Sequence, residues 1–190
     1  MFGLFKNKKS IHEPVKLQRQ EVQKAFPEAF ASTILNGEDC DQITGGHGNF
    51  GSLTNPIPVN GSIGEIKYLA KLRGETGCAL LFHRGGSTPS PVTDKPVDDY
   101  EVVCLDGTQW NTLYFDMYHP RRSNLAPPGY SLMPCIKKLK MDSPIGFGVN
   151  FPVKDFPFEL PDALERFHGG SDAFARRARE WLAKGNFSRP

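Results

Sequence analysis

Apolar residues recur three or four positions apart along several segments of the chain, which is the spacing of a helix with one buried face. Val22 and Phe26 follow this spacing in a segment that begins at Pro14, and proline suits the first turn of a helix. The next segment begins at another proline and repeats the spacing. The pattern predicts two short helices, over residues 14–26 and 27–36.

A third helix is predicted over residues 62–73, where the pattern is strongest. Ser62 and Glu65 match a capping box, in which a hydroxyl and a carboxylate satisfy backbone N–H groups of the first turn. The apolar residues expected to form its buried stripe are Ile63, Ile66, Leu69, Ala70 and Leu72. Similar signals predict two more helices, over 161–168 and 171–183.

Strand patterns occupy the middle of the chain. Residues 78–82 are apolar at every position, which is typical of a strand buried on both faces, and this strand is expected to end at His83. Residues 100–105 precede a turn at Asp106-Gly107, and residues 109–118 then alternate between apolar and polar. These last two segments predict a hairpin.

The stretches between these elements are rich in glycine and proline. Residues 44–61, 85–99 and 120–158 are therefore predicted to be long loops. Residues 1–13 are expected to form a flexible tail on a single globular domain over residues 14–190. Together the patterns predict an α+β fold, with a small, mainly antiparallel sheet packed by three or four helices and carrying long Gly/Pro-rich loops.

Composition limits the partners of the protein. The chain has 190 residues and a formal net charge of +2, which is too small to favour nucleic acid as a partner. No apolar run approaches the roughly 20 residues that cross a membrane. The apolar start precedes the first lysines, the reverse of the order in an export signal. Cys78 and Cys104 lie in strand candidates, so reduced thiols in the cytoplasm are expected, or a disulfide if the two strands are neighbours.

Two strand candidates end in an aromatic residue, histidine and arginine. The polar residues of the first ending are His83, Arg84, Gly85, Gly86 and Ser87, and those of the second are His119, Arg121, Arg122 and Ser123. Guanidinium groups match carboxylates and phosphates, and glycines let backbone N–H groups approach the same oxygens. The endings therefore predict an anion-binding cleft whose ligand residues are Arg84, Ser87, Arg121, Arg122 and Ser123, although such residues are also common in solvated turns.

The same endings contain candidate catalytic groups. His83 and His119 would act as general acid or base, with Asp116 or Asp106 orienting an imidazole, because histidine titrates near neutral pH. Asp116 and His119 have opposite strand parity, so they meet only if the chain bends between them. Histidines that form hydrogen bonds within the fold are the structural alternative.

Metal binding and thiol catalysis have little support in the sequence. No short-spaced ligand set such as HExxH or CxxC is present, so neither a metal nor another cofactor is expected. Cys40 lies between Asp39 and Asp41, whose negative charges disfavour a thiolate.

Two functional hypotheses remain. The first is an intracellular binding or interaction protein that takes an anionic small molecule or protein segment at the ends of the 78–83 and 109–118 strands. The second is a small hydrolase or transferase that acts on a phosphorylated or carboxylated substrate through His83 or His119. Both hypotheses require the two strands to end on the same side of the sheet.

Overall fold

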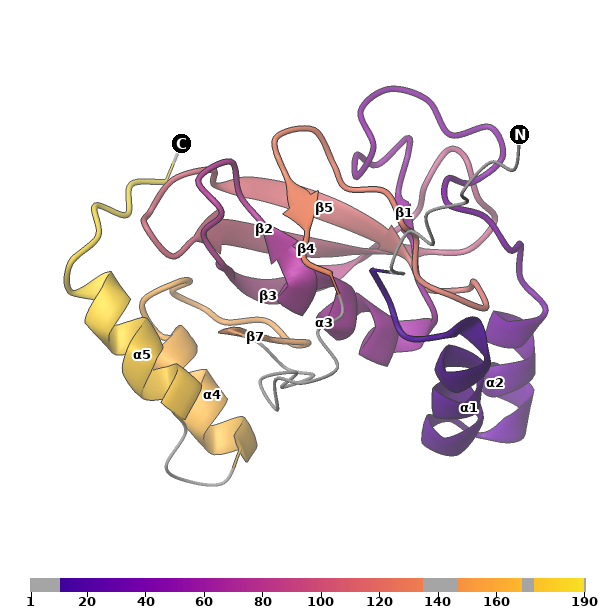
Figure 1. The fold of residues 1–190 in the computed structure, drawn as a ribbon, viewed down its shortest axis with the longest axis horizontal. Coiled ribbons are helices and arrows are strands. Elements are labelled where there is room, and N and C mark those ends of the chain that lie inside the picture. The colour runs from indigo at the N-terminus through magenta and orange to yellow at the C-terminus, as the bar shows by residue number, and fades with distance from the viewer. Residues whose placement is uncertain (1–10, 135–146, 169–172, 190) are drawn as a thin grey trace, which may run out of the picture.

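The computed structural model describes residues 11–134, 147–168 and 173–189 (Figure 1). The helices of this part of the chain are α1 (Val15–Ala25), α2 (Glu28–Leu35), α3 (Gly61–Lys71), α4 (Leu160–His168) and α5 (Ala173–Leu182). Its strands are β1 (Ile57–Pro58), β2 (Leu72–Arg73), β3 (Leu80–Thr88), β4 (Val97–Cys104), β5 (Asn111–Asp116), β6 (Ser131–Leu132) and β7 (Phe147–Val149). The predicted mixture of helices and strands is confirmed.

The main sheet has five strands in the order β1-β5-β4-β3-β7, and β2 pairs with β6 in a small second sheet. β4 pairs with β3 and β5 in antiparallel fashion, as the predicted hairpin requires, but β1 and β7 join the edges in parallel. The sheet is therefore mixed rather than mainly antiparallel, and the described residues form five helices rather than three or four. Both outer strands lie in predicted loops, because segments of two or three residues show no readable alternation.

The stretch predicted as a loop over residues 85–99 begins and ends in strand, and only residues 89–96 connect the two strands outside the sheet. β3 continues to Thr88 and pairs with β4 from Val97 onward, with a shift in register between Arg84 and Gly86. A Cβ at Gly85 would lie 2.0 Å from a carboxylate oxygen of Asp99, so a larger residue here would require the Asp99 side chain to move. The polar composition reflects a two-stranded ribbon that extends beyond the core, which sequence composition alone does not distinguish from a loop.

Alternate residues of the central strands face two separate cores. Leu80, Phe82 and Tyr100 pack with α3 on one face of the sheet. Leu81 and Val103 pack with α4 and α5 on the other face. The apolar run at 78–82 therefore supplies both faces, as predicted. α1 and α2 lie together at one end of the molecule, and α4 and α5 lie together at the other (Figure 1).

Helix α3 starts differently from the predicted capping box. Its N-cap is Asn60 and no side chain caps the helix. Gly61 has φ +76°, and a Cβ there would lie 2.7 Å from the Phe26 ring, so α1 packs closely on this helix end. Glu65 is turned inward and is fully buried. Since the buried face contains Glu65, the predicted core residues Ile63 and Ile66 are displaced to its edge and are only half-buried.

Residues 1–10 of the predicted tail lie outside the described residues. The last residues of that stretch are packed against the chain: His12 is buried, and its ring bonds to the carbonyl of Ser123. Glu13 forms an ion pair with Arg122. The start of the described chain is thus attached to the loop that follows β5.

Candidate functional site

The two predicted polar endings reach the same end of the sheet. β3 and β5 are both antiparallel to β4, so they run in the same direction. The register places Arg84 and Leu113 opposite Tyr100 on either side of β4. Arg84 extends toward the α3 face of the sheet, whereas His83 extends toward the α4 and α5 face because neighbouring strand residues alternate.

His83 is held by the fold on the α4 and α5 face. Its Nε2 lies 3.1 Å from a carboxylate oxygen of Glu101, and its Nδ1 accepts a hydrogen bond from the backbone N–H of Val153. The ring stacks on Phe156 at a centroid distance of 4.4 Å. Both ring nitrogens of His83 therefore contact groups of the fold, as expected for a histidine with a structural role.

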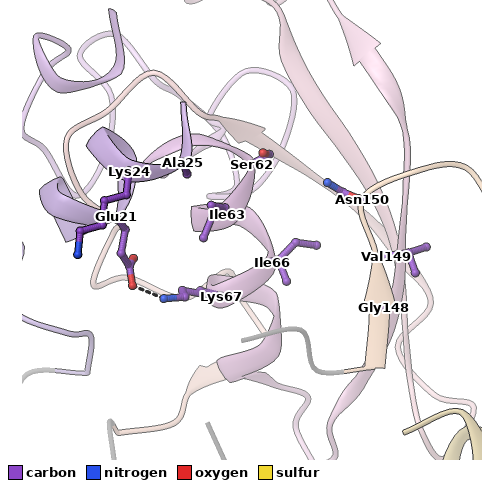
Figure 2. Close-up of a pocket in the computed structure, with 10 residues that line it drawn as sticks. All are labelled: Glu21, Lys24, Ala25, Ser62, Ile63, Ile66, Lys67, Gly148, Val149 and Asn150. Carbon is purple, nitrogen blue, oxygen red and sulfur yellow. Dashed lines mark hydrogen bonds and ion pairs between the residues drawn. The ribbon is translucent and has the colours of Figure 1, made fainter. Parts of the chain in front are cut away.

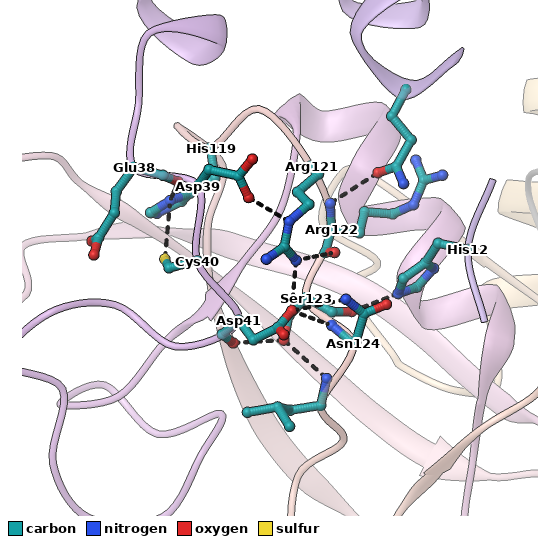
Figure 3. Close-up of polar contacts among 12 residues, drawn as sticks. His12, Glu38, Asp39, Cys40, Asp41, His119, Arg121, Arg122, Ser123 and Asn124 are labelled. Carbon is teal, nitrogen blue, oxygen red and sulfur yellow. Dashed lines mark hydrogen bonds and ion pairs between the residues drawn. The ribbon is translucent and has the colours of Figure 1, made fainter. Parts of the chain in front are cut away.

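His119 is engaged at a different place. Its Nε2 lies 3.3 Å from an oxygen of Asp116. Its Nδ1 lies 2.8 Å from the Glu38 carbonyl and 3.7 Å from the Cys40 sulfur (Figure 3). Asp116 accepts a hydrogen bond from the backbone N–H of Tyr118, and this turn brings Asp116 and His119 together. Burial disfavours the imidazolium, but the bonds to Asp116, Cys40 and Glu38 outweigh burial and raise the pKa of His119 to about 10.

The two candidate histidines do not form one site. The contacts described for His83 involve residues that His119 does not contact. A polar cavity of about 340 Å³ lies beside His119 and is also lined by Asp116, Tyr118 and Lys95. At neutral pH the imidazolium of His119 keeps its proton, so it supplies fixed charge to this cavity rather than a base.

Arg121 and Ser123 of the second ending bind groups of the chain itself. The Arg121 guanidinium donates to carboxylate oxygens of Asp39 and Asp41 at 2.5 Å each (Figure 3). The Ser123 hydroxyl donates to the Asp41 carbonyl. Both acidic neighbours of Cys40 are therefore paired with a cation, which the sequence does not reveal. These contacts attach the loop after α2 to the segment after β5.

Arg122 is buried completely and connects three segments. Its guanidinium contacts carboxylates of Glu13 and Glu21 and the side-chain oxygen of Asn60. Its backbone N–H donates to Gln18 of α1. These partners precede Arg122 by 62 to 109 positions, so no local pattern indicates them. Arg122 therefore lies in the interior, away from any surface where a ligand enters.

Arg84 and Ser87 of the first ending form a cluster with Asp98 of β4. Arg84 donates to an Asp98 oxygen at 2.7 Å, and the Ser87 hydroxyl donates to the same oxygen at 2.6 Å. The Arg84 side chain keeps 30% of its surface exposed. Its Nε is buried and forms no hydrogen bond with the described residues. Arg84 thus combines a donor that has no hydrogen bond to the described residues with a partly exposed side chain.

A pocket of about 250 Å³ lies beside this cluster. Its lining residues come from α2, α3, β3, β4 and the segments after β5 and β7: Phe30, Ser62, Arg84, Asp98, Met117 and Asn150. The pocket therefore lies between the ends of β3 and β5. Of the five ligand residues predicted from the sequence, Arg84 alone lines it, and Ser87 contacts it through Asp98.

Glu65 and Tyr100 extend this cluster into the interior. The Tyr100 hydroxyl donates to a carboxyl oxygen of Glu65 at 2.9 Å. Burial raises the pKa of Glu65 well above its usual range, and the charge of Asp98 adds to this effect. The sequence analysis assigned Glu65 to a helix cap, although its position four residues before Leu69 places both on one helix face.

Replacing Glu65 with glutamine is expected to stabilise the protein increasingly as pH rises. The folded protein retains the Glu65 proton above pH 4.5, the ordinary pKa of this side chain, so the wild type loses stability there at up to ~1.4 kcal/mol per pH unit. Glutamine still accepts the Tyr100 hydrogen bond and does not ionise. Urea denaturation at pH 4.5 and at neutral pH measures the difference, with exposed Glu159→Gln as control. An equal effect of Glu65→Gln at both pH values would contradict the assignment.

An apolar groove of about 540 Å³ adjoins the Arg84 pocket, and the two share Ser62 and Asn150. Its other lining residues belong to α1, α3 and β7: Glu21, Lys24, Ala25, Ile63, Ile66, Lys67, Gly148 and Val149. Ile66 extends from α3 toward the segment that carries Gly148 and Val149 (Figure 2). Lys67 is paired with Glu21 at the rim. The half-buried isoleucines of α3 therefore form a wall of this groove.

Other kinds of site find no support in the described part of the chain. No three histidine, cysteine, aspartate or glutamate side chains there converge as metal ligands do. Cys40, Cys78 and Cys104 are free thiols, and burial raises the pKa of Cys104 to about 11, so that thiol is protonated at neutral pH. None of the described helices has the length and apolar character needed to span a membrane. Comparison of the chain with protein-family models, curated proteins and solved structures gave no match.

Proposed function

We propose that this protein binds a small anionic ligand in the pocket between the ends of β3 and β5, with the anion on Arg84. The observation that carries the proposal is the guanidinium itself. It is part-exposed in a pocket, it has a buried Nε without a hydrogen bond to the described residues, and Asp98 engages only one of its nitrogens. A buried donor that lacks a partner is uncommon in folded proteins, and an anion would bind the exposed part of this guanidinium.

The charges of Arg84 and Asp98, which both line the pocket, cancel, so the lining carries no net negative charge that would repel an anion. Burial raises the pKa of Glu65 well above its usual range, which favours the uncharged form of this neighbouring carboxyl group. The planar guanidinium suits bidentate contact with a carboxylate or a phosphate.

A hydrolase or transferase has less support as the function. His83 bonds to Glu101 and Val153 away from the Arg84 pocket, and His119 holds its proton beside Asp116. Neither imidazole lines the pocket that contains Arg84. A binding protein of the cytoplasm, where Cys40, Cys78 and Cys104 stay reduced, accounts for these features more simply.

Replacing Arg84 with glutamine is expected to weaken the binding of simple anions at least ~tenfold, because a charge-assisted contact is lost. Propanoate and methyl phosphate are the probes, titrated while the ¹⁵N NMR signals of Arg84 Nε–H and of the Ser62 and Asn150 amides are followed. Arg84→Lys keeps the charge but not the planar fork and should bind with intermediate affinity.

Arg176→Gln is the matched control, because it removes the same charge from an exposed position on α5. Since Arg84→Gln leaves Asp98 buried without its cation, the double variant Arg84→Gln/Asp98→Asn is measured in parallel. Loss of binding in Arg84→Gln and in Arg84→Gln/Asp98→Asn, with binding retained by Arg176→Gln, supports the proposal. Unchanged binding in a folded Arg84 variant would refute it.

A further inference from the structure

The Arg84 pocket and the apolar groove beside it differ in chemical character. The pocket contains Arg84 and Asp98 at its polar end. The groove presents the aliphatic side chains of Ile63, Ile66 and Val149. Ser62 and Asn150 line both the pocket and the groove, so the two cavities adjoin each other. A ligand that fills both must therefore combine a charged group with an apolar body.

The charged side chains of the groove lie at its rim, and its walls are uncharged. Lys67 is paired with Glu21 at the rim, while Lys24 adds an exposed ammonium group on α1. The groove walls between this rim and the Arg84 pocket carry aliphatic, glycine and small polar side chains. A chain lying there meets no charge until it reaches Arg84.

We propose that the ligand is a single-chain amphiphile whose carboxylate binds Arg84 and whose alkyl chain lies in the groove between α3 and β7. This inference rests on the proposed function and specifies its ligand class. The groove of about 540 Å³ falls within the size range of small-molecule sites, and the pocket of about 250 Å³ adjoins it. Such sites are mainly apolar with a few fixed polar groups. Arg84 provides the polar group and the α3 isoleucines provide the apolar wall.

Charge complementarity favours this occupant over an amphipathic helix from a protein partner. A helix would place its apolar side chains in the groove but would not require an anion at the recessed Arg84 guanidinium, whose neighbours are Ser87 and Asp98. A carboxylate at the end of a flexible chain reaches that position directly.

The test is a series of unbranched carboxylates, from butanoate through hexanoate and octanoate to decanoate, kept below micelle-forming concentrations and titrated by calorimetry. Affinity is expected to rise by about fourfold per methylene, the fold-change that ~0.8 kcal/mol per buried CH₂ gives. Octylammonium and octanol serve as probes of the head group, and both should bind at least ~tenfold more weakly than octanoate.

Two variants on exposed alanines separate groove binding from general hydrophobic adsorption. Ala25→Trp places a large ring at the groove, whereas Ala29→Trp places it on α2, outside the groove lining. Ala25→Trp should abolish the gain of affinity with chain length while propanoate binding persists. Ala29→Trp should behave as the wild type.

The outcomes distinguish this inference from the proposed function. Binding of short anions that depends on Arg84 but does not strengthen with chain length would overturn the inference and leave the proposed function intact. Chain-length dependence that survives Ala25→Trp would also overturn the inference. Equal binding of octanoate and octylammonium would overturn the proposed function, because the guanidinium would then not select an anion.

Discussion

Replacing Arg122 with methionine is expected to lower the free energy of unfolding by about 2–4 kcal/mol. Removal of one partner of a fully buried ion pair costs about 3–5 kcal/mol. The effect here is smaller because the side chains of Glu13 and Glu21 remain 23% and 27% exposed and also contact lysines. Methionine keeps an unbranched apolar side chain in place of the aliphatic part of arginine, but it leaves the side-chain oxygen of Asn60 without its hydrogen-bond donor. Urea denaturation monitored by tryptophan fluorescence measures the change.

Arg121→Met is the matched control for this experiment. It removes the same charge from the adjacent position, but its partners Asp39 and Asp41 have side chains 57% and 38% exposed. Exposed ion pairs contribute about 0–1 kcal/mol, so Arg121→Met should have the smaller effect. Equal destabilisation by the two variants would contradict the central role of Arg122.

The ion pair with Arg122 also affects the titration of Glu13. Burial alone would raise the pKa of Glu13, but the charge of Arg122 opposes burial and helps to lower this pKa to about 2.

The stability of the protein is expected to fall as pH rises from 6.5 to 10, and replacing His119 with glutamine should make this fall less steep by the contribution of His119. Folding raises the pKa of His119 from 6.5 to about 10, so the folded state binds this proton more tightly. The contribution is complete below pH 6.5 and is lost as pH rises through 10. At ~1.36 kcal/mol per pKa unit it is on the order of 3–5 kcal/mol.

Asp116, Glu38 and Cys40 contact His119, and Asp94, Lys95 and Tyr118 line the cavity beside it. Asp116→Asn should therefore flatten the same part of the stability profile, because the imidazolium loses its carboxylate. His47→Gln is the control, since His47 is exposed and its variant should keep the wild-type slope. If the wild type and His119→Gln differ by a constant amount from pH 6.5 to 10, His119 does not gain its proton on folding.

Local patterns predicted the elements that carry repeated spacing. The apolar run at 78–82 belongs to β3, and Leu81 and Phe82 enter different cores as a strand buried on both faces requires. The helix predicted over 62–73 corresponds to α3 (Gly61–Lys71). The buried stripe of this helix was predicted less well. The sheet covers the helix face that contains Glu65, and Ile66 lies beside the groove instead. Which face of a helix becomes buried depends on segments that are distant in the sequence.

Pairing across long distances in the chain accounts for what the sequence did not indicate. Arg84, Arg121 and Arg122 look equivalent as polar ends of strands, yet Arg121 and Arg122 bind carboxylates 80 or more positions earlier. Arg84 differs because its described carboxylate partner lies on the adjacent strand, 14 positions away, and its guanidinium keeps a surface in the pocket. Similar residues in similar contexts thus acquire different roles from their tertiary partners.

The short outer strand β1 has a consequence for self-association. Long, flat edge strands offer rows of unpaired backbone groups on which another copy can add a strand, and this is a common route to aggregation. Here β1 contributes two residues, Ile57 and Pro58, and proline has no backbone N–H to donate. This edge of the described sheet therefore offers little continuous backbone as a template for a strand from a second copy.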